Sequence, residues 1–455
     1  MGKELNKNKV LATLLILILL GLLVGMVWYD RQQRAALESK ASQEIQPVQT
    51  QVAMDEQSES LNTDLTSGEG SIESNSGEFP FQGLNMKETP QTFEGQTGVV
   101  KIRSFGGLQT VTDLTDLTNV TSDSYTREIE RLQSLGLSIE TNESNGIDYS
   151  LIFDYMAPYL NYADITMAQL GMPVAYPQLP QSNGETMNAP RALLAQLSAM
   201  GVDILSTASQ HSLDKGNQGI IATLNNIEDN NMEAIGTSKN TDSVNTPLIK
   251  DINGVKVGFL SYTSVMDETV TEEDQALLIN TTNNIDFELI RQYADENDAL
   301  VVTIQHDADV SQEDRTALYQ SLSDAGVSVI IGNNLVDVQP IEWINGDQTV
   351  AIHSQANMMA EGVVSTLVEF GFQKEADGIV KILVPKVMPM VFSKLEDSEY
   401  LKLAPLADAM YFKFGSSQTE WQDFVDQIQS VSTDLEVYSH LESNLFNEDQ
   451  DNFRE

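Results

Sequence analysis

Residues 201–240, GVDILSTASQHSLDKGNQGIIATLNNIEDNNMEAIGTSKN, contain the strand–loop–helix unit that decides the fold class. VDILSTA, residues 202–208, is a short apolar run with β-branched residues, which is typical of a buried strand. GIIATLNNIEDNN, residues 219–231, has its apolar residues at helical spacing. The loop between them carries the polar residues Ser209, Gln210, His211 and Asp214. A strand that delivers polar side chains just before a helix predicts an α/β protein with a site at that sheet edge.

The same alternation extends in both directions from this unit. We predict strands at 98–107, 255–263, 299–305, 327–332 and 349–355, and helices at 189–201, 287–297 and 314–326. Residues 368–389 add two strands around a hairpin, so antiparallel pairs accompany the parallel ones. The predicted fold class is therefore α/β, with mixed β-sheet layers flanked by helices.

The pattern changes after Pro389, and we expect residues 392–455 to form a C-terminal extension with an amphipathic helix. One helical stripe of TEWQDFVDQIQSVSTDLEV, residues 419–437, combines Trp421, Phe424, Val425, Ile428, Val431 and Leu435. We predict that this helix docks on the domain, and the alternative is that it binds a partner.

The N-terminal region predicts a membrane anchor. Lys3, Lys7 and Lys9 precede an apolar run, VLATLLILILLGLLVGMVWY, that covers residues 10–29. A run of about twenty apolar residues spans a bilayer, and Trp28 and Tyr29 suit its interface. We therefore predict a cytoplasmic tail at 1–9, a transmembrane signal anchor at 10–29 and a disordered acidic linker at 30–97. Residues 98–391 would then be the extracellular domain of a single-pass cell-membrane protein.

Composition excludes several classes of partner and site. The net charge is 25 − 67 = −42, which repels nucleic acid and anionic lipid. The chain has no cysteine, so it forms neither disulfides nor thiolate metal sites. We expect no nucleic-acid partner, and contact with the membrane only through the N-terminal helix.

Histidines gather at the ends of the predicted strands. Three of the chain's four histidines follow strands, and His440 is the exception. The candidate site residues at these ends are His211, Asp214, His306, Asp307, Asn334, His353 and Asn357. Imidazole and carboxylate groups together suit a divalent metal, which lowers the pKa of bound water for hydrolysis.

The order and spacing of several segments resemble the bacterial CapA/PgsA family of capsule and poly-γ-glutamate synthesis. Residues 201–240 are similar to the family's strand, A-N-N-H-x-x-D-x-G motif and helix. INGVKVGFLSYT, residues 252–263, and DAGVSVIIGNNLVDVQPIEWINGDQTVAIHSQANM, residues 324–358, follow the same family pattern. The resemblance covers 98–391 and implies a calcineurin-like metallophosphoesterase fold, an extracellular domain on a membrane anchor and a two-metal site.

This chain departs from the family at the positions of the metal ligands. Neutral residues stand where the family has ligands or ligand motifs: Gly107, Gln169, Gly171, Asn334 and Val336. His211, Asp214, His306 and Asn357 match the motifs, while His353 replaces the family's Tyr. Neutral amide oxygens are weak donors for transition metals, so we expect no two-metal phosphoesterase activity.

Three interpretations follow. The leading one is a catalytically inactive binding or scaffold component of envelope polymer assembly, within a membrane synthesis complex and without a cofactor. The alternative is a hydrolase whose rebuilt mononuclear site holds one divalent metal ion through His211, His306 and His353. The third is a structural domain whose anchor and tether carry the function. Because a charge of −42 repels a polyanionic polymer, a neutral glycan or a protein partner fits the first interpretation equally well.

Overall fold

The computed structural model describes residues 93–109, 113–136, 141–184, 186–264, 278–307, 309–333, 337–394, 398, 400–411, 424–426, 428, 432 and 434–443. All of them belong to one compact unit, Ser76–Glu455. No helix within these ranges is long and apolar enough to cross a bilayer. The predicted cytoplasmic tail, the transmembrane anchor and the acidic linker up to residue 92 lie outside the described residues.

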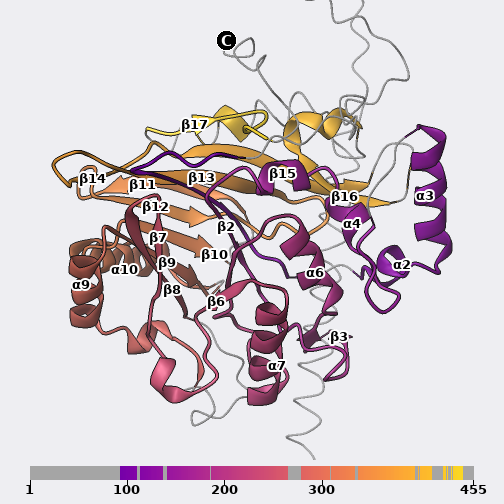
Figure 1. Ribbon diagram of the computed structural model, residues 1–455, viewed down its shortest axis with the longest axis horizontal. Helices are drawn as coiled ribbons and strands as arrows, with labels where there is room; N and C mark the ends of the chain where they lie inside the picture. The colour runs from indigo at the N-terminus through magenta and orange to yellow at the C-terminus, as the bar shows by residue number, and fades with distance from the viewer. Residues whose placement is uncertain are drawn as a thin grey trace, which may run out of the picture. The chain divides into compact units, whose positions relative to one another are not determined.

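Two large β-sheets carry the fold (Figure 1). The first has the order β16-β15-β13-β1-β2-β5-β6, with β14 beside β13 and β17 beside β15. Its strands are β1 (Val99–Phe105), β2 (Ile165–Gln169), β5 (Ile204–Ser206), β6 (Glu233–Ile235), β13 (Val364–Lys374), β14 (Val380–Ile382), β15 (Lys386–Lys394), β16 (Leu401–Pro405) and β17 (Glu436–Val437). Within this sheet β1, β2, β5 and β6 run parallel, while β13 is antiparallel to β1.

The second sheet has the order β11-β12-β10-β9-β8-β7. Its strands are β7 (Leu248–Ile252), β8 (Val255–Thr263), β9 (Ala299–Gln305), β10 (Val329–Asn333), β11 (Gln339–Ile344) and β12 (Thr349–Ser354). The four central strands are parallel, and β7 and β11 pair antiparallel at the two edges. A separate hairpin joins β3 (Ser182–Asn183) and β4 (Met187–Asn188). The prediction of mixed β-sheet layers is confirmed.

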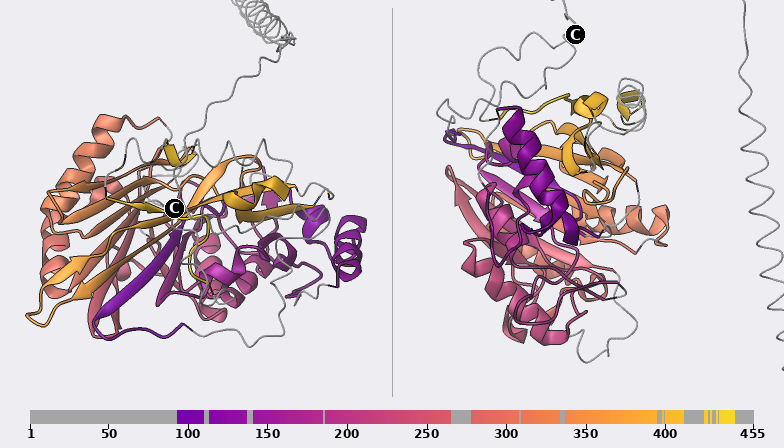
Figure 2. Two further views of the ribbon diagram at one scale, coloured as in Figure 1. Left: turned by 90° about the horizontal axis from the view of Figure 1, so that it is seen from above. Right: turned by 90° about the vertical axis from the view of Figure 1, so that its right-hand side faces the viewer.

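Helices cover the outer faces of both sheets. They are α2 (Thr115–Thr118), α3 (Asp123–Ser134), α4 (Ser150–Phe153), α5 (Ala157–Leu160), α6 (Ala192–Ala199), α7 (Gly216–Asp229), α9 (Phe287–Glu296) and α10 (Gln312–Asp324), with short 3₁₀ turns at Thr241–Ser243, Thr282–Asn284 and η4 (Leu406–Tyr411). Ser122 caps the N-terminus of α3, and Ser311 caps the N-terminus of α10. Each serine hydroxyl accepts a backbone N–H from the first turn of its helix. Figure 2 shows α3 and α10 at opposite ends of the strand layers.

Of the four apolar clusters formed by the described residues, three lie between these layers. The inner core packs one face of the first sheet, with Ile102, against one face of the second, with Val301. A second core buries the outer face of the first sheet under α3 to α6, and a third buries the outer face of the second sheet under α9 and α10. The layer order is therefore helix, sheet, sheet, helix, as Figure 1 also shows.

The C-terminal segment takes part in the same cores. Strand β15 runs through the expected boundary at residue 391, and β16 and β17 pair with it in the first sheet. Phe424 and Ile428 of the predicted amphipathic helix are buried in the inner core, and Leu435 packs against it. Trp421 and Val431 of the same stripe lie outside the described residues. The described residues of this segment therefore pack beside β11. There the Ile341 amide donates to the Ser432 hydroxyl at 2.9 Å.

Candidate functional site

A small hollow opens where the carboxyl ends of strands from both sheets meet. It holds about 250 Å³ of empty space, open solvent included. We call it the amide hollow, and its lining residues are Gly107, Gln109, Gln169, Gly171, Gln305, Ala356 and Asn357. These residues follow or end β1, β2, β9 and β12, which is the edge where α/β sheets place their sites. None of the lining side chains carries a charge.

Beneath the hollow, neutral hydrogen bonds join the two sheets. Ser206 Oγ at the end of β5 lies 2.7 Å from Ser261 Oγ and 2.8 Å from Thr303 Oγ1, both in the second sheet. Asn333 Nδ2 donates to Gln169 Oε1 across the same interface at 3.0 Å. Buried polar groups need such partners, and here hydroxyls and amides supply them to one another. The edge is therefore held by uncharged side chains.

Sequence reasoning missed the hydroxyl part of this network. Ser206, Ser261 and Thr303 each follow at least two apolar residues in their strands, and all three are buried. A polar residue beside apolar residues in a strand was the available signal for such a network. A polar side chain that is buried without a hydrogen-bond partner costs free energy, so a partner is expected.

His306 and His353 lie on the opposite face of the second sheet. Successive strand residues point to opposite faces, so Gln305 faces the first sheet and the next residue, His306, faces α10. His306 Nε2 lies 2.6 Å from Tyr319 Oη, and the Tyr319 ring is centred 4.8 Å from that of His353. His353 Nε2 lies 2.6 Å from Glu342 Oε1. The two histidines thus flank a buried tyrosine of α10, away from the amide hollow.

Burial sets the electrostatics of this pair. It lowers the pKa of His306 to about 3, with smaller contributions from the charge of Arg315 and from His353. Burial also lowers the pKa of His353, although the Glu342 carboxylate acts in the opposite direction. Both rings are therefore neutral near pH 7 and serve as hydrogen-bonding groups of the helix–sheet packing.

His211 forms a separate pair with Asp214 in the loop after β5. His211 Nδ1 lies 2.9 Å from Asp214 Oδ2, and the same oxygen accepts the backbone N–H of Met187 at 2.5 Å. The Asp214 side chain is only 1% exposed, and its Oδ1 is buried with no hydrogen-bond partner among the described residues. The pair therefore fixes the loop after β5 to the β3–β4 hairpin.

The remaining candidates divide between the hollow and the surface. Asn357 lines the amide hollow, where its Nδ2 donates to the Gln109 carbonyl at 3.1 Å. Asp307 caps a local turn, because its Oδ1 accepts the Asp309 amide at 3.0 Å. Asn334 lies outside the described residues. Of the seven predicted site residues, Asn357 is thus the one found in the lining of this hollow.

The donors at the hollow do not fit the metal pair that the fold resemblance implies. Gly107 and Gly171 offer no side-chain donor, and the Gln169 carbonyl already accepts from Asn333. Across the described ranges, no group of three or more His, Asp or Glu side chains is placed to hold a metal ion.

The three histidines of the alternative hypothesis, His211, His306 and His353, have different surroundings in the structure. Strand alternation turns His306 and His353 toward α10, while His211 follows a different strand in the other sheet and pairs with Asp214.

Comparisons with known proteins identify relatives of this chain. The family described as "Bacterial capsule synthesis protein PGA_cap" matches residues 121–361. The PGA biosynthesis protein CapA of Bacillus subtilis (strain 168) is 25% identical over 252 residues, which cover 52% of this chain and 65% of that protein. The capsule biosynthesis protein CapA of Bacillus anthracis is 23% identical over 201 residues, 42% of this chain and 48% of that protein. The chain thus spans less than two thirds of the length of the curated relatives it matches.

Among solved structures, a chain described as a novel phosphatase from Mycoplasma pneumoniae is similar, with a TM-score of 0.35 and 9% sequence identity. The match covers 65% of this chain and 95% of that one. The family match alone extends over more than half of the chain, from the region of α3 through β12. The chain therefore belongs to the family of bacterial capsule synthesis proteins described as PGA_cap.

Proposed function

We propose that this chain is a binding or scaffold component of capsule or poly-γ-glutamate type polymer biosynthesis, and that it works without metal-dependent hydrolysis. The observation that supports the proposal is the absence of charged side chains from the described lining of the amide hollow. Where the strand ends of both sheets converge, amides and glycines line the hollow, and the histidines face elsewhere.

Physical chemistry explains why such an edge does not support two-metal catalysis. Two divalent cations close together repel each other strongly, so such sites need anionic ligands between them. Zinc and manganese sites draw these ligands from carboxylates and imidazoles, and amide oxygens bind such ions weakly. The layer order of helix, sheet, sheet, helix supports the resemblance to a metallophosphoesterase-like fold. In this proposal the chain keeps that fold but has lost the ligands for the two metal ions.

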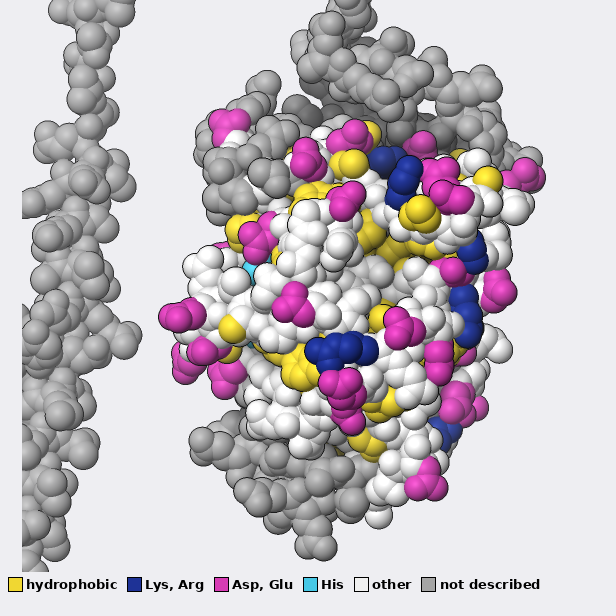
Figure 3. Space-filling model, turned by 90° about the vertical axis from the view of Figure 1, so that its left-hand side faces the viewer, with side chains coloured by type: hydrophobic (Ala, Val, Ile, Leu, Met, Phe, Trp, Pro, Cys, Tyr) yellow, Lys and Arg dark blue, Asp and Glu magenta, His cyan; other side chains and the backbone are white. Residues whose placement is uncertain are grey.

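The proposal places the chain at the cell membrane. Residues 10–29 anchor it, residues 30–97 act as an acidic tether, and the folded part lies outside the cell, where a surface polymer is assembled. On the face shown in Figure 3, acidic side chains are scattered among few Lys and Arg. A surface of this kind favours a protein partner or an uncharged ligand over direct contact with a polyanion.

Metal content and hydrolysis test the proposal together. The full chain, purified in detergent, is incubated with Zn²⁺ or Mn²⁺ and desalted, and its metal content and hydrolysis of p-nitrophenyl phosphate are measured. We expect far less than one ion per chain and no hydrolysis above the buffer. Near-stoichiometric metal with hydrolysis that His211→Ala abolishes would refute the proposal.

A cellular test addresses the role in the polymer. Deleting the gene should lower the amount of surface polymer, and the wild-type chain should restore it. A His211→Asn chain, whose side-chain amide can still donate to Asp214, should restore it equally well, since no hydrolytic step depends on the imidazole. Wild-type polymer levels in the deletion strain would contradict the assigned role.

A further inference from the structure

Four asparagines of this chain are each followed by a glycine: Asn145, Asn183, Asn253 and Asn345. Such a pair can react with itself, because glycine has no side chain to keep its backbone nitrogen from the asparagine amide. The glycine nitrogen forms a bond to the asparagine Cγ, and the bond from Cγ to Nδ2 breaks. The proton lost by the glycine nitrogen passes through water to the departing amide, which leaves as ammonia. Water then opens the cyclic imide, and an aspartate or an isoaspartate replaces the asparagine.

The fold around each pair controls the rate of this reaction. Ring closure requires a rotation about the Cα–C bond of the asparagine that brings the glycine nitrogen beside its Cγ. Neither a strand nor a tight turn holds the chain in that rotation, so the pair must first leave its native conformation. Each hydrogen bond that breaks in this step lowers the rate about fivefold. The pair with the fewest restraints should therefore react first.

Asn253 and Asn345 are held by their own side-chain amides. Both have the positive φ of a tight hairpin turn, 55° in each case. Asn253 Nδ2 donates to Asp164 Oδ1 at 2.7 Å. Asn345 Nδ2 donates to Ser323 Oγ and to Asp324 Oδ1, each at 2.9 Å. These turns also join β7 to β8 and β11 to β12, so releasing either pair opens the end of a hairpin in the second sheet.

Asn145 is held through the glycine that follows it. Its φ is 56°, and the Gly146 amide donates to Glu143 Oε1 at 2.5 Å. A carboxylate that accepts this N–H favours the protonated nitrogen, so it opposes the loss of the proton that the attack requires. The Gly146 carbonyl also accepts the Val120 amide at 3.1 Å, which ties the turn to the segment before α3. This pair is therefore restrained at its nucleophile.

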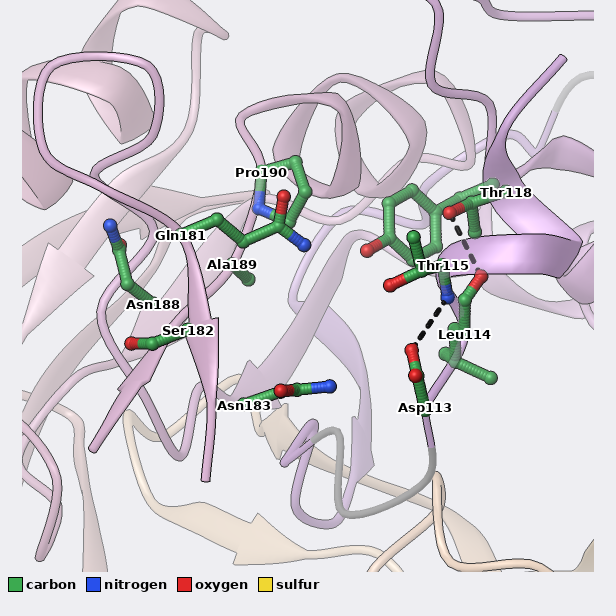
Figure 4. Close-up of a pocket in the computed structure, with 11 residues that line it drawn as sticks. Asp113, Leu114, Thr115, Thr118, Gln181, Ser182, Asn183, Asn188, Ala189 and Pro190 are labelled. Carbon is green, nitrogen blue, oxygen red and sulfur yellow. Dashed lines mark hydrogen bonds between the residues drawn. The ribbon is translucent and has the colours of Figure 1, made fainter. Parts of the chain in front are cut away.

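Asn183 has a much weaker set of restraints. It ends β3 in the β3–β4 hairpin, whose strands have two residues each. Its side chain is exposed and makes no hydrogen bond to the described residues. Figure 4 shows this amide reaching out from the hairpin, with no dashed line to another drawn residue. The Gly184 amide donates to the Thr186 carbonyl at 3.3 Å, which is beyond the usual length of about 2.7–3.2 Å for such a bond.

We propose that Asn183 is a site of spontaneous deamidation by the Gly184 nitrogen, and that the product loosens the loop that carries His211. Asn183 pairs with Met187 in the hairpin, and the Met187 amide donates to Asp214 Oδ2 at 2.5 Å. The same oxygen lies 2.9 Å from His211 Nδ1. The backbone of isoaspartate runs through its Cβ, so this product adds an atom to the chain and shifts the hairpin register. The inference goes beyond the proposed function and does not depend on it.

Peptide mapping by mass spectrometry tests the site. The full chain in detergent is kept in warm, mildly alkaline buffer for several weeks, and conversion to aspartate and isoaspartate is measured at all four pairs. We expect conversion at Asn183 to be at least about tenfold faster than at Asn253 or Asn345, where more hydrogen bonds have to break. In concentrated urea this ranking should disappear, because the unfolded chain restrains none of the pairs. Gly184→Ala should slow conversion at Asn183 several-fold and leave the other pairs unchanged.

Hydrogen exchange tests the effect on the hairpin. The matched control is Asn183→Gln, an exposed substitution whose longer side chain would have to close a less favourable, larger ring. After the same incubation, the amides around Met187 and His211 should exchange at least about threefold faster in the wild type than in this variant, because local opening becomes easier. Conversion at Asn183 no faster than at Asn345, a ranking that persists in urea, or equal exchange in the two incubated chains would each overturn the inference.

Discussion

Gly106 and Gly107 are adjacent in the sequence, yet an added methyl group should affect them very differently. A Cβ at Gly106 would lie 2.2 Å from the Ala356 carbonyl oxygen and 3.0 Å from Gln355 Cβ. A Cβ at Gly107 would come no closer than 3.7 Å, to Asn357 Oδ1. The first contact is with backbone, so relief requires the end of β1 and the loop after β12 to separate.

That separation has a predictable effect on stability. It strains two hydrogen bonds of this junction, from Gly107 N to the Ala356 carbonyl at 3.2 Å and from Met358 N to the Gly107 carbonyl at 3.0 Å. Overpacking costs about 1–3 kcal/mol, and each weakened hydrogen bond adds up to about 1 kcal/mol. We therefore expect Gly106→Ala to lower the free energy of unfolding by about 3 kcal/mol, or the melting temperature by about 6 °C.

Differential scanning fluorimetry on the full chain measures the effect, with Gly107→Ala as the matched control. The control should melt within about 1 °C of the wild type, since its new methyl group meets ordinary van der Waals contact. Equal melting temperatures for Gly106→Ala and the wild type would refute the close approach of β1 to this loop. A Gly107→Ala variant as unstable as Gly106→Ala would refute the assignment of the strain to one position.

Three further predictions concern titration and packing. Burial raises the pKa of Asp154 to about 6 against the opposing effect of Lys402, so this group stabilises the fold below its ordinary pKa of 3.8, and the contribution is lost as the pH rises to about 6. Asp154→Asn should flatten that part of the stability profile in urea unfolding, and an unchanged slope would contradict the burial of this carboxyl. Burial lowers the pKa of His306 to about 3, so its contribution to the free energy of unfolding is present above pH 6.5 and is lost as the pH falls toward 3. His306→Gln should therefore make the stability depend less on pH between 6.5 and 3. An imidazole ring that titrates near 6.5 by NMR would disprove its burial against Tyr319. Phe424→Ala should lower the free energy of unfolding by about 3 kcal/mol, while Val425→Ala, at a half-buried neighbour, should change it by less than about 1 kcal/mol; equal effects would contradict the docking of Phe424 in the inner core.

The succession of strands and helices was predictable from the sequence because it depends on local patterns. The predicted helix at 314–326 is observed as Gln312–Asp324, and the predicted strand at 299–305 is observed as Ala299–Gln305. The division of the strands between two sheets was not predictable, since β1 pairs with β13 more than 250 residues later in the chain. Pairing over such separations leaves no local signal.

The sheet edge that carries the amide hollow could be expected from the sequence, but the orientation of the side chains along that edge could not. Every residue of β9, β10 and β12 is buried, so these strands show no alternation of polar and apolar residues. Without it, the sequence does not tell which face of a strand meets the other sheet. His306 was therefore expected at the hollow that Gln305 lines, one residue away and on the opposite face.

The central position of β1 has a consequence for how the chain folds. Arg103 of β1 pairs with Glu369 of β13, and Lys101 pairs with Glu442 near the end of the described chain. Contacts between residues so far apart in sequence form slowly, because closing a long loop costs entropy before any contact compensates for it. Strand β2 can pair with one edge of β1 early in translation, but the other edge of β1 has no partner until β13 has been synthesised. The cell must therefore keep a long nascent segment from aggregating before this domain can form.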